Sequence, residues 1–264
     1  MGMKIIVLVK QVPDTETKIQ VKPGETSIST DGVTYVINPY DEFAIEEALK
    51  IKEAKGEGEV TLVSLGWDKA AEALRTGLAM GADKAVHLND AAFLGGDACS
   101  DAVALAKTIQ GMEYDLVLCG KQAIDNDNHQ VGVRVAEVLG IPHVAVVTKL
   151  ELEDGKAVAT REIEGGSEVV EVPLPAIITC QKGLNEPRYA SLKGIMKAKK
   201  KPLEAKAPAD IGASADEVGK AGAKTTVLTM TPPPERAAGR VIEGEPEDAA
   251  KEVVKLLREE AKVI

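Results

Sequence analysis

The stretch KIIVLVK, residues 4–10, is a short and nearly continuous run of apolar side chains, most of them β-branched. A run of this kind is typical of a strand that is covered on both faces, as in a parallel sheet. Further apolar runs follow at residues 60–64, 85–88, 115–119 and 143–147. Segments with helical spacing separate them, and strands that alternate with helices form right-handed crossovers. The sequence therefore predicts an α/β fold with a doubly wound, mostly parallel sheet.

Four helices are expected between these strands. The first begins at an Asn-Pro pair and runs through residues 38–54, where apolar positions recur among charges. The next two are expected at about residues 68–80 and 97–110. The fourth ends at Gly140, with Pro142 just beyond, as helix C-termini commonly do.

The pattern changes after Thr148. Residues 149–180 contain an Asp-Gly and a Gly-Gly pair between segments of alternating polarity, which predicts antiparallel hairpin strands added to the sheet. Beyond Lys201 the chain is rich in Ala, Lys and Pro and carries few large apolar residues. We therefore expect an α/β domain over residues 1–201 and an extended linker and C-terminal arm over residues 202–264. The latter segment is either a disordered tail or an arm laid on another subunit.

The composition narrows the class of protein. The 264 residues carry 32 Lys and Arg against 42 Asp and Glu, a net charge of −10, which argues against nucleic-acid binding. The 3 cysteines form no metal-ligand spacing, and no apolar run approaches the roughly 18–20 residues that a membrane span needs. We expect a reduced, soluble protein without membrane insertion, located in the cytoplasm or, in a eukaryote, in the mitochondrial matrix.

Catalytic motifs are missing from the sequence. It has neither a GxGxxG after the first strand nor a GxxxxGK[ST] loop, and neither GxSxG nor HExxH occurs. His87 and His143 are expected in or beside strands, and Cys119 is expected to be buried and inert. Glu46 and Glu47 look like an exposed helix face. No catalytic residue and no metal ligand is therefore assigned, and the residues favour a binding protein over a catalyst.

Three strand ends are informative, at residues 10–13, 64–67 and 119–122, and a polar loop follows the last of them. Ligands in open parallel sheets bind outside the carboxyl ends of the strands. Here the polar loop AIDNDNHQVG, residues 123–132, leads into the N-terminus of the fourth helix, where unpaired N–H groups and the helix dipole favour an anion. Gly120 would let a ligand approach the backbone closely. The alternative is a capped surface turn that binds nothing.

Four stretches of the sequence resemble the β subunits of electron-transfer flavoproteins. They are INPYDEFAIEEALKIKE (37–53), GKQAIDNDNHQVG (120–132), ATREIEGGSEVVEVPLPAIIT (159–179) and LNEPRYASLKGIMKAKKK (184–201). The third follows the family's signature, and the fourth is similar to its partner-recognition loop. The resemblance runs almost from end to end and includes the C-terminal arm. It implies an adenine-nucleotide-binding, Rossmann-like version of the predicted fold.

The resemblance also implies a heterodimer with an α subunit, which would hold most of one redox-active FAD. The β subunit would hold a structural AMP and touch the flavin, with Tyr40 at the flavin edge. The implied electron donors are dehydrogenases of the acyl-CoA type, and the implied acceptor is a membrane quinone oxidoreductase. The residues that would bind these cofactors are Leu8, Asn38, Pro39, Tyr40, Asp41, Leu65, Gly120, Lys121, Gln122, Ala123, Ile124, Asp125, Asn126, Asp127, Asn128, His129, Gln130 and Val131.

Two positions depart from the usual residues of the family. Thr15 stands where mitochondrial-type relatives have an aromatic residue, and Val131 replaces the Thr of many AMP-binding members. A hydrophobic residue at position 131 is common in bifurcating members, which bind a second FAD there and oxidise NADH. The NEPRY and IMKAKKK motifs are more similar to AMP-binding members, so AMP is expected and a second FAD is the alternative. A free-standing adenine-nucleotide-binding signalling module is a third interpretation.

The recognition loop that the resemblance implies spans residues 188–197. Leu192, set among small residues, is expected to enter a pocket on the dehydrogenase, since one buried apolar side chain contributes about 1.5–3 kcal/mol. The lysines that follow would steer acidic partners, although a solvated lysine face is the other interpretation. The residues assigned to partner recognition are Arg188, Tyr189, Leu192, Ile195, Met196 and Lys197.

Overall fold

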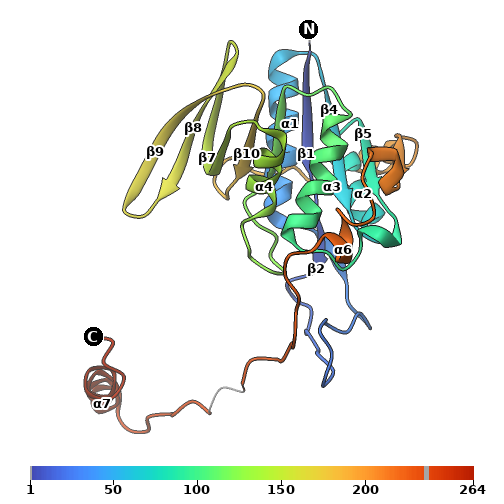
Figure 1. The fold of residues 1–264 in the computed structure, drawn as a ribbon. Coiled ribbons are helices and arrows are strands. Elements are labelled where there is room, and N and C mark those ends of the chain that lie inside the picture. The colour runs from blue at the N-terminus through green and yellow to red at the C-terminus, as the bar shows by residue number, and fades with distance from the viewer. Residues whose placement is uncertain (1, 235–237) are drawn as a thin grey trace. The chain divides into compact units, whose positions relative to one another are not determined.

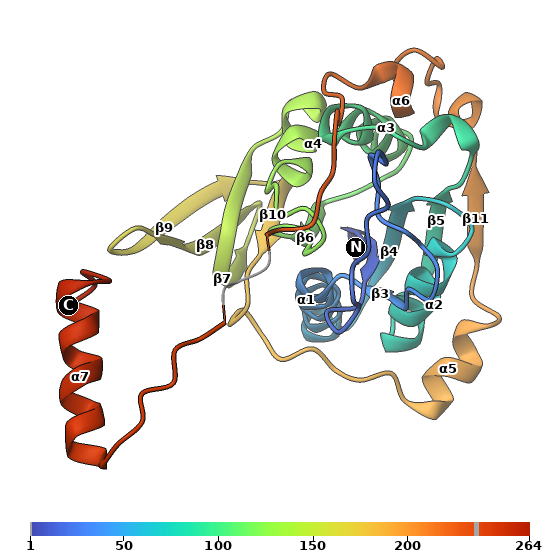
Figure 2. The same ribbon diagram turned by 90° about the horizontal axis from the view of Figure 1, so that it is seen from below.

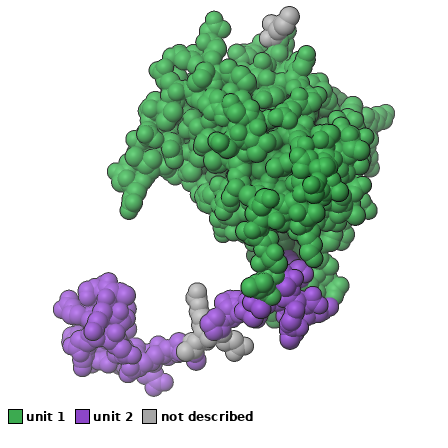
Figure 3. Space-filling view, viewed as in Figure 1, with its two compact units in different colours: residues 1–19, 29–228 green, residues 20–28, 229–264 purple. Residues whose placement is uncertain are grey.

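The structure is a computed structural model that describes residues 2–234 and 238–264. The chain divides into two units, which Figure 3 shows in different colours. The larger unit comprises residues 1–19 and 29–228, and the smaller unit comprises residues 20–28 and 229–264. The larger unit carries the sheet and the helices that pack on it.

Within the described residues, the larger unit is built on a nine-stranded sheet (Figure 1). The strands are β1 Met3–Leu8, β4 Gly58–Leu65, β5 Lys84–Leu88, β6 Leu116–Gly120, β7 His143–Glu153, β8 Lys156–Ile163, β9 Gly166–Pro173, β10 Ala176–Cys180 and β11 Leu203–Lys206. Their order is β11-β5-β4-β1-β6-β10-β7-β8-β9, parallel from β11 to β7 and antiparallel from β7 to β9. A small antiparallel sheet pairs β2 (Gln11–Pro13) with β3 (Tyr35–Ile37). The predicted fold class, with its hairpin addition, is confirmed.

Helices cover both faces of the sheet, as Figure 1 and Figure 2 show from two directions. The helices of the larger unit are α1 Pro39–Lys55, α2 Ala70–Met80, α3 Ala98–Gln110, α4 Val131–Leu139, α5 Leu192–Ala198 and α6 Gly219–Gly222, with 3-10 turns at Ala91–Phe93 and Pro208–Ile211, and α7 Pro246–Glu259 belongs to the smaller unit. Successive side chains of a strand point to opposite faces. Ile5 and Val7 of β1 therefore join the core under α1 and α2, whereas Ile6 and Leu8 join the core under α3 and α4.

The strand order reverses at β1. The chain proceeds from β1 through β4 and β5 to one side, and then returns through α3 to β6 on the other side of β1. β1 accordingly pairs with both β4 and β6. In open sheets of this kind, the crevice at the reversal, outside the carboxyl ends of the strands, is the usual ligand site. The reversal thus lies at β1, next to the strand end at Cys119 and Gly120 where the sequence predicts a ligand site.

The expectation that Glu46 and Glu47 lie on an exposed helix face was wrong. Their exposed fractions are 5% and 7%. The segment ahead of α5 lies against them, since Arg188 bonds to Glu46 and Asn185 bonds to Glu47. His87, by contrast, is buried in β5, as expected for a strand residue.

The chain beyond Lys201 stays on the sheet before it reaches the smaller unit. β11 pairs in parallel with β5, and the larger unit extends to residue 228. Asp97 holds the end of this stretch, because its Oδ2 accepts 2.8 Å hydrogen bonds from the backbone N–H groups of Lys224 and Thr225. The other carboxylate oxygen of Asp97 caps the N-terminus of α3.

The smaller unit contains α7, a helix with charged residues on one side and exposed apolar residues on the other. Val253, Val254 and Leu257 are 40%, 46% and 37% exposed, and no residue of α7 is buried. The sparse apolar content gives this unit too little to bury as a core of its own. None of the helices in the described parts of the chain combines the length and apolar character that a membrane crossing requires.

Candidate functional site

Asp41 ties together the carboxyl ends of β1 and β6. Its Oδ2 accepts a 2.7 Å hydrogen bond from the backbone N–H of Lys10, and its Oδ1 accepts a 2.9 Å bond from the backbone N–H of Gly120. Asp41 belongs to the first turn of α1. These bonds fix the start of α1 at the crevice where the strand order reverses.

Glycine is required at two positions of this crevice. A Cβ at Gly120 would lie 2.5 Å from Oδ1 of Asp41 and 2.6 Å from Cβ of Tyr40. A Cβ at Gly132, in the first turn of α4, would lie 2.6 Å from Sγ of Cys119. Both distances are far below an ordinary van der Waals contact, so neither position accepts a side chain without movement of its neighbours. The two glycines allow α1, β6 and α4 to converge.

Burial changes the acidity of Asp41. Its side chain is 5% exposed, and burial raises its pKa to about 7 against the lowering effect of hydrogen bonds from the Lys10 N–H, the Asn38 side chain and the Gly120 N–H. The carboxyl is therefore partly protonated at neutral pH. A neutral group at this position spares a phosphate nearby part of the repulsion that a full carboxylate would exert.

Asn38 holds the loop that follows β6. Its Nδ2 donates a 2.9 Å hydrogen bond to the carbonyl of Gln122, and its Oδ1 accepts a 3.2 Å bond from the backbone N–H of Ile124. Asn38 is 1% exposed, so the two bonds form away from competing water. The loop from Gly120 onward is thus shaped by the chain itself before any ligand binds.

The loop turns sharply before it enters α4. Asp127 and His129 have positive φ values of 48° and 55°, in the left-handed region. Gln122 donates a side-chain hydrogen bond to Asp127, and Asn128 accepts a 3.1 Å bond from the backbone N–H of Gln130. α4 then begins without a side-chain cap, so its first N–H groups are available to an anion.

The charges around the crevice are mixed. Nζ of Lys10 lies 2.6 Å from Oδ2 of Asp125, and Nζ of Lys121 lies 5.1 Å from the ring centroid of Tyr40. Burial raises the pKa of Asp101 to about 6, although Lys10 opposes this rise. Cations and hydrogen-bond acceptors in one crevice suit a phosphate ester that also carries sugar hydroxyls.

Covalent chemistry has little support in the crevice. Cys119 is buried, and burial raises the pKa of its thiol, which keeps it protonated. Among the described residues, no group of His, Cys, Asp and Glu side chains has the arrangement of a metal site.

The structure brings most of the predicted cofactor residues together. Leu8 and Leu65 end the neighbouring strands β1 and β4, and Tyr40 and Asp41 begin α1 beside them. The loop residues 120–131 close the other side through Asn38 and Asp41. The residues assigned to partner recognition lie elsewhere, along the chain between β10 and the end of α5.

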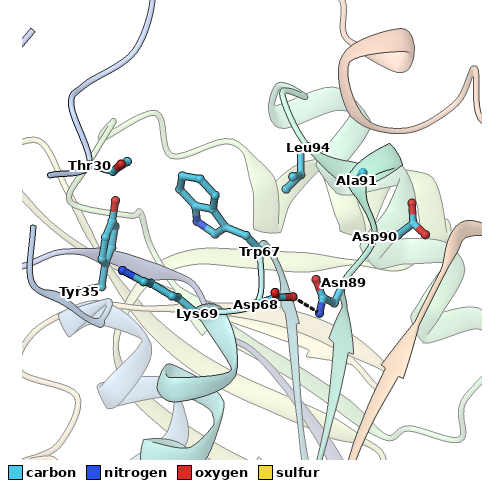
Figure 4. A pocket seen from close by; sticks show the side chains of 9 residues that line it. All are labelled: Thr30, Tyr35, Trp67, Asp68, Lys69, Asn89, Asp90, Ala91 and Leu94. Carbon is cyan, nitrogen blue, oxygen red and sulfur yellow. Dashed lines mark hydrogen bonds between the residues drawn. The ribbon is translucent and has the colours of Figure 1, made fainter.

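A pocket that the sequence did not predict lies at the ends of β4 and β5 (Figure 4). Its volume is about 410 Å³, and Trp67 and Tyr35 offer it two aromatic side chains. Nζ of Lys69 lies 5.8 Å from the ring centroid of Tyr35, and Asn89 donates a 2.8 Å hydrogen bond to Asp68. The one signal in the sequence was Trp67, the single tryptophan, directly after a strand end. The lining residues are Thr30, Tyr35, Trp67, Asp68, Lys69, Asn89, Asp90, Ala91 and Leu94.

The predicted recognition loop presents apolar side chains to solvent. Tyr189, Leu192 and Met196 are 98%, 83% and 72% exposed. Ser191 caps α5 by accepting a 3.0 Å hydrogen bond from the backbone N–H of Gly194. Arg188 differs from the others, because its guanidinium points inward to carboxylates of α1.

Comparisons with known proteins identify the family of the chain. The family profile described as "Electron transfer flavoprotein domain" matches residues 26–211. "Electron transfer flavoprotein subunit beta" of Syntrophomonas wolfei is 44% identical over 263 residues, covering 100% of this chain and 99% of the relative. The protein of the same name from Bacillus subtilis is 45% identical over 263 residues, covering 99% of this chain and 100% of the relative.

A third relative carries a different name. "Caffeyl-CoA reductase-Etf complex subunit CarD" of Acetobacterium woodii is 43% identical over 244 residues, covering 92% of each chain. The similarity spans the strand ends around Gly120, the hairpin and the recognition loop in the first two relatives, because their alignments cover nearly the whole chain. This chain belongs to the electron-transfer flavoprotein family, as a β subunit.

Proposed function

We propose that the chain pairs with an α subunit to share one FAD, and that its own crevice holds AMP as a permanent structural nucleotide. The observation that carries the nucleotide assignment is the preformed cradle at the reversal of the strand order. Gly120 leaves no room for a side chain, Asn38 shapes the loop, and α4 begins uncapped. An adenylate supplies the phosphate for the N–H groups and the apolar base for the ends of β1 and β4.

In this proposal the residues of this chain hold the AMP and shield one edge of the flavin. Residues 126–131 would bind the AMP phosphate, Leu8 and Leu65 would contact the base, and Tyr40 would lie at the flavin edge. The FAD supplies reversible electron transfer when it is bound. Lys121, whose Nζ lies 5.1 Å from the centroid of the Tyr40 ring, restrains that ring. The chain itself makes and breaks no bond.

The proposed electron route runs from an acyl-CoA-type dehydrogenase through the FAD to a membrane quinone oxidoreductase. Its support is the exposed apolar set Tyr189, Leu192 and Met196, followed at once by a run of lysines. Aromatic and large apolar side chains of this kind serve as interface anchors, and the lysines speed association with acidic surfaces.

Cofactor counting tests the assignment directly. We would co-express the chain with its α subunit, purify the complex, release the nucleotides with acid, and separate them by chromatography. One FAD and one AMP per heterodimer is the expected result. Two FAD without AMP would overturn the AMP assignment, and a chain that purifies alone and carries no nucleotide would overturn the whole proposal.

The second candidate is a bifurcating complex that binds a second FAD in this chain and oxidises NADH. The pocket at the ends of β4 and β5 favours it, since Trp67 and Tyr35 offer aromatic faces to a planar ring beside the crevice. Val131 and the relative from the caffeyl-CoA reductase complex also favour it. NADH oxidation that requires both a high-potential and a low-potential acceptor would select this candidate over the first.

A further inference from the structure

We propose that Arg188 is a positioning residue that clamps the docking segment, residues 184–198, to α1 and does not itself touch the electron donor. The inference rests on the proposed function, because it concerns how the same docking segment is held. The sequence placed Arg188 among the residues that contact the partner. In the structure its guanidinium binds carboxylates of α1 in this chain instead.

Arg188 binds two carboxylates of α1 at once. Its Nε and Nη2 donate hydrogen bonds of 2.7 Å and 3.0 Å to the two oxygens of Glu46. Its Nη1 and Nη2 donate bonds of 2.6 Å and 3.0 Å to the two oxygens of Glu53. Its backbone N–H donates a further 3.1 Å bond to Glu46. Two such forked pairs fix both the position and the plane of the guanidinium.

Glu46 makes the clamp hard to open. Its side chain is 7% exposed, and a buried carboxylate is strongly disfavoured unless a cation and hydrogen bonds accompany it. Withdrawal of Arg188 toward a partner would leave Glu46 buried without that cation. The guanidinium is therefore held at α1 mainly by Glu46. Glu53 is 59% exposed, so its ion pair with Arg188 contributes less to the clamp.

The docking segment has few other polar attachments at this end, although Leu184 and Ala190 pack against the core under α1 and α2. Residues 184–191, which lead from β10 toward α5, form no helix or strand. Beside Arg188, Asn185 bonds to α1, through the carbonyl of Phe43 at 3.0 Å and through Glu47 at 2.9 Å. Figure 2 shows this extended segment passing α1 on its way to α5.

The far end of the docking segment is attached to α2. Nη1 of Arg75 donates hydrogen bonds of 2.6 Å and 2.9 Å to the carbonyls of Ala198 and Lys201 at the end of α5. A Cβ at Gly194 would lie 2.3 Å from the carbonyl oxygen of Ala79, so α5 sits directly on α2. Tyr189 and Leu192 therefore stand between two anchors, with Arg188 next to Tyr189 and the Gly194 contact with α2 two residues after Leu192.

Preorganisation is what the clamp contributes. Tyr189 is 98% exposed and Leu192 is 83% exposed, so neither packs against this chain to hold itself in place. A free segment would have to be ordered at each encounter, and that entropy cost lowers affinity. When only a tenth of the molecules hold the competent arrangement, the apparent Kd rises about tenfold.

The test compares Arg188→Gln and Arg188→Lys in the complete heterodimer. Arg188→Gln is expected to raise the KM for a reduced acyl-CoA-type dehydrogenase about tenfold, with kcat and FAD content unchanged. Arg188→Lys keeps the charge but not the fork, so it should recover only part of the affinity. The matched control is Lys50→Gln, which removes one positive charge from the exposed surface of α1.

Hydrogen exchange provides a readout that direct contact would not give. In the free heterodimer, Arg188→Gln should increase exchange over residues 184–198 and leave exchange in β1 unchanged. Leu192→Ala should raise KM without changing exchange, because it removes a contact side chain and leaves the clamp intact. Unchanged exchange in Arg188→Gln would overturn the proposal, as would a KM equal to that of the Lys50→Gln control.

The same design separates this inference from the proposed function. If no acyl-CoA-type dehydrogenase reduces the wild-type heterodimer, the donor assignment fails. The exchange comparison still decides whether Arg188 clamps the segment. A general loss of stability would show in β1 and in the melting temperature, and Arg188→Lys then serves as the variant in which the clamp is tested.

Discussion

The carboxylate of Asp41 lies 2.9 Å from the backbone nitrogen of Gly120, so that the first turn of α1 is bonded to the carboxyl end of β6. The same carboxylate reaches Lys10 at the end of β1. Three elements that are far apart in the sequence thus meet at one buried group. This junction shapes the crevice in which we propose a nucleotide, and its parts can be perturbed one at a time.

Gly120→Ala tests the close approach at this junction. The new Cβ would lie 2.5 Å from Oδ1 of Asp41, so α1 and the loop after β6 must separate. We expect a loss of stability of about 1–3 kcal/mol, as overpacking usually gives, together with loss of the bound nucleotide. Urea unfolding and nucleotide counting measure the two effects.

Gly166→Ala is the control for this variant. Its Cβ would meet no atom within 4 Å and its φ lies outside the left-handed region, so stability and nucleotide content should stay at their wild-type values. Full nucleotide occupancy in Gly120→Ala would show that the junction can open without harm to the crevice.

Asp41→Asn tests the titration of the buried carboxyl. Burial raises the pKa of Asp41 to about 7 from its usual 3.8. A raised carboxyl pKa means that the unfolded chain ionises first, so wild-type stability falls as pH rises from about 4 to about 7 and is level above that. Between pH 5.5 and pH 8 the ionisation of this one group lowers the free energy of unfolding by on the order of 2 kcal/mol. An Asn side chain has no such titration.

The comparison of urea midpoints at pH 5.5 and pH 8 measures this difference. The urea midpoint of Asp41→Asn should change less with pH than that of wild type. Its midpoint at pH 5.5 should be lower, because an amide cannot accept hydrogen bonds from both N–H groups as the carboxyl group does. Glu137→Gln, on an exposed turn of α4, is the control and should follow wild type. Parallel pH curves for Asp41→Asn and wild type would contradict the raised pKa.

Part of this site could be predicted from the sequence and part could not. The apolar runs placed β1 and β6 correctly, and the alternation of strands and helices predicted a parallel sheet, but the structure supplies the strand order and its reversal at β1. The loop after Gly120 was predictable from its polar residues and from its place before a helix. The burial of Glu46 and Glu47 could not be predicted, since the residues that cover them, Arg188 and Asn185, lie more than a hundred positions further along the chain.

β7 shows a second limit of the sequence pattern. The structure has one strand over His143–Glu153, whereas the sequence indicated a strand at residues 143–147 and separate hairpin strands after residue 148. Val144 and Val147 are buried in the first half of the strand, whereas half-buried and exposed residues alternate from Thr148 onward, so its apolar pattern changes midway. A bulge lies near this change, with Val146 at φ 63° and a register shift between Val147 and Lys149.

Asp97→Ala tests the attachment of the chain beyond β11. Burial alone would raise the pKa of Asp97, but hydrogen bonds from Ser100, Lys224 and Thr225 lower it to about 2. A lowered carboxyl pKa means that this stabilisation is present above about pH 4 and is lost as pH falls toward 2. Removal of the carboxylate should cost about 1–2 kcal/mol, as loss of a helix cap does, and should free residues 224–228.

Limited proteolysis at neutral pH measures the release. Asp97→Ala should be cut within residues 224–228 faster than wild type. Asp90→Ala is the matched control, because Asp90 also caps a helical turn through Ala92 but does not bond to residues 224–225. Equal cleavage rates for the two variants would mean that the cap, and not the attachment, is all that Asp97 provides.

Trp67 reports which nucleotide fills the crevice. It is the single tryptophan of the chain, is 53% exposed, and lines the pocket at the ends of β4 and β5. AMP has no second ring system to reach this pocket, so Trp67 should stay accessible to acrylamide when the complex is loaded with AMP. Subtraction of the emission of Trp67→Phe isolates this residue from any tryptophan of the α subunit. A second FAD would quench Trp67 and shield it, and that result would select the bifurcating candidate instead.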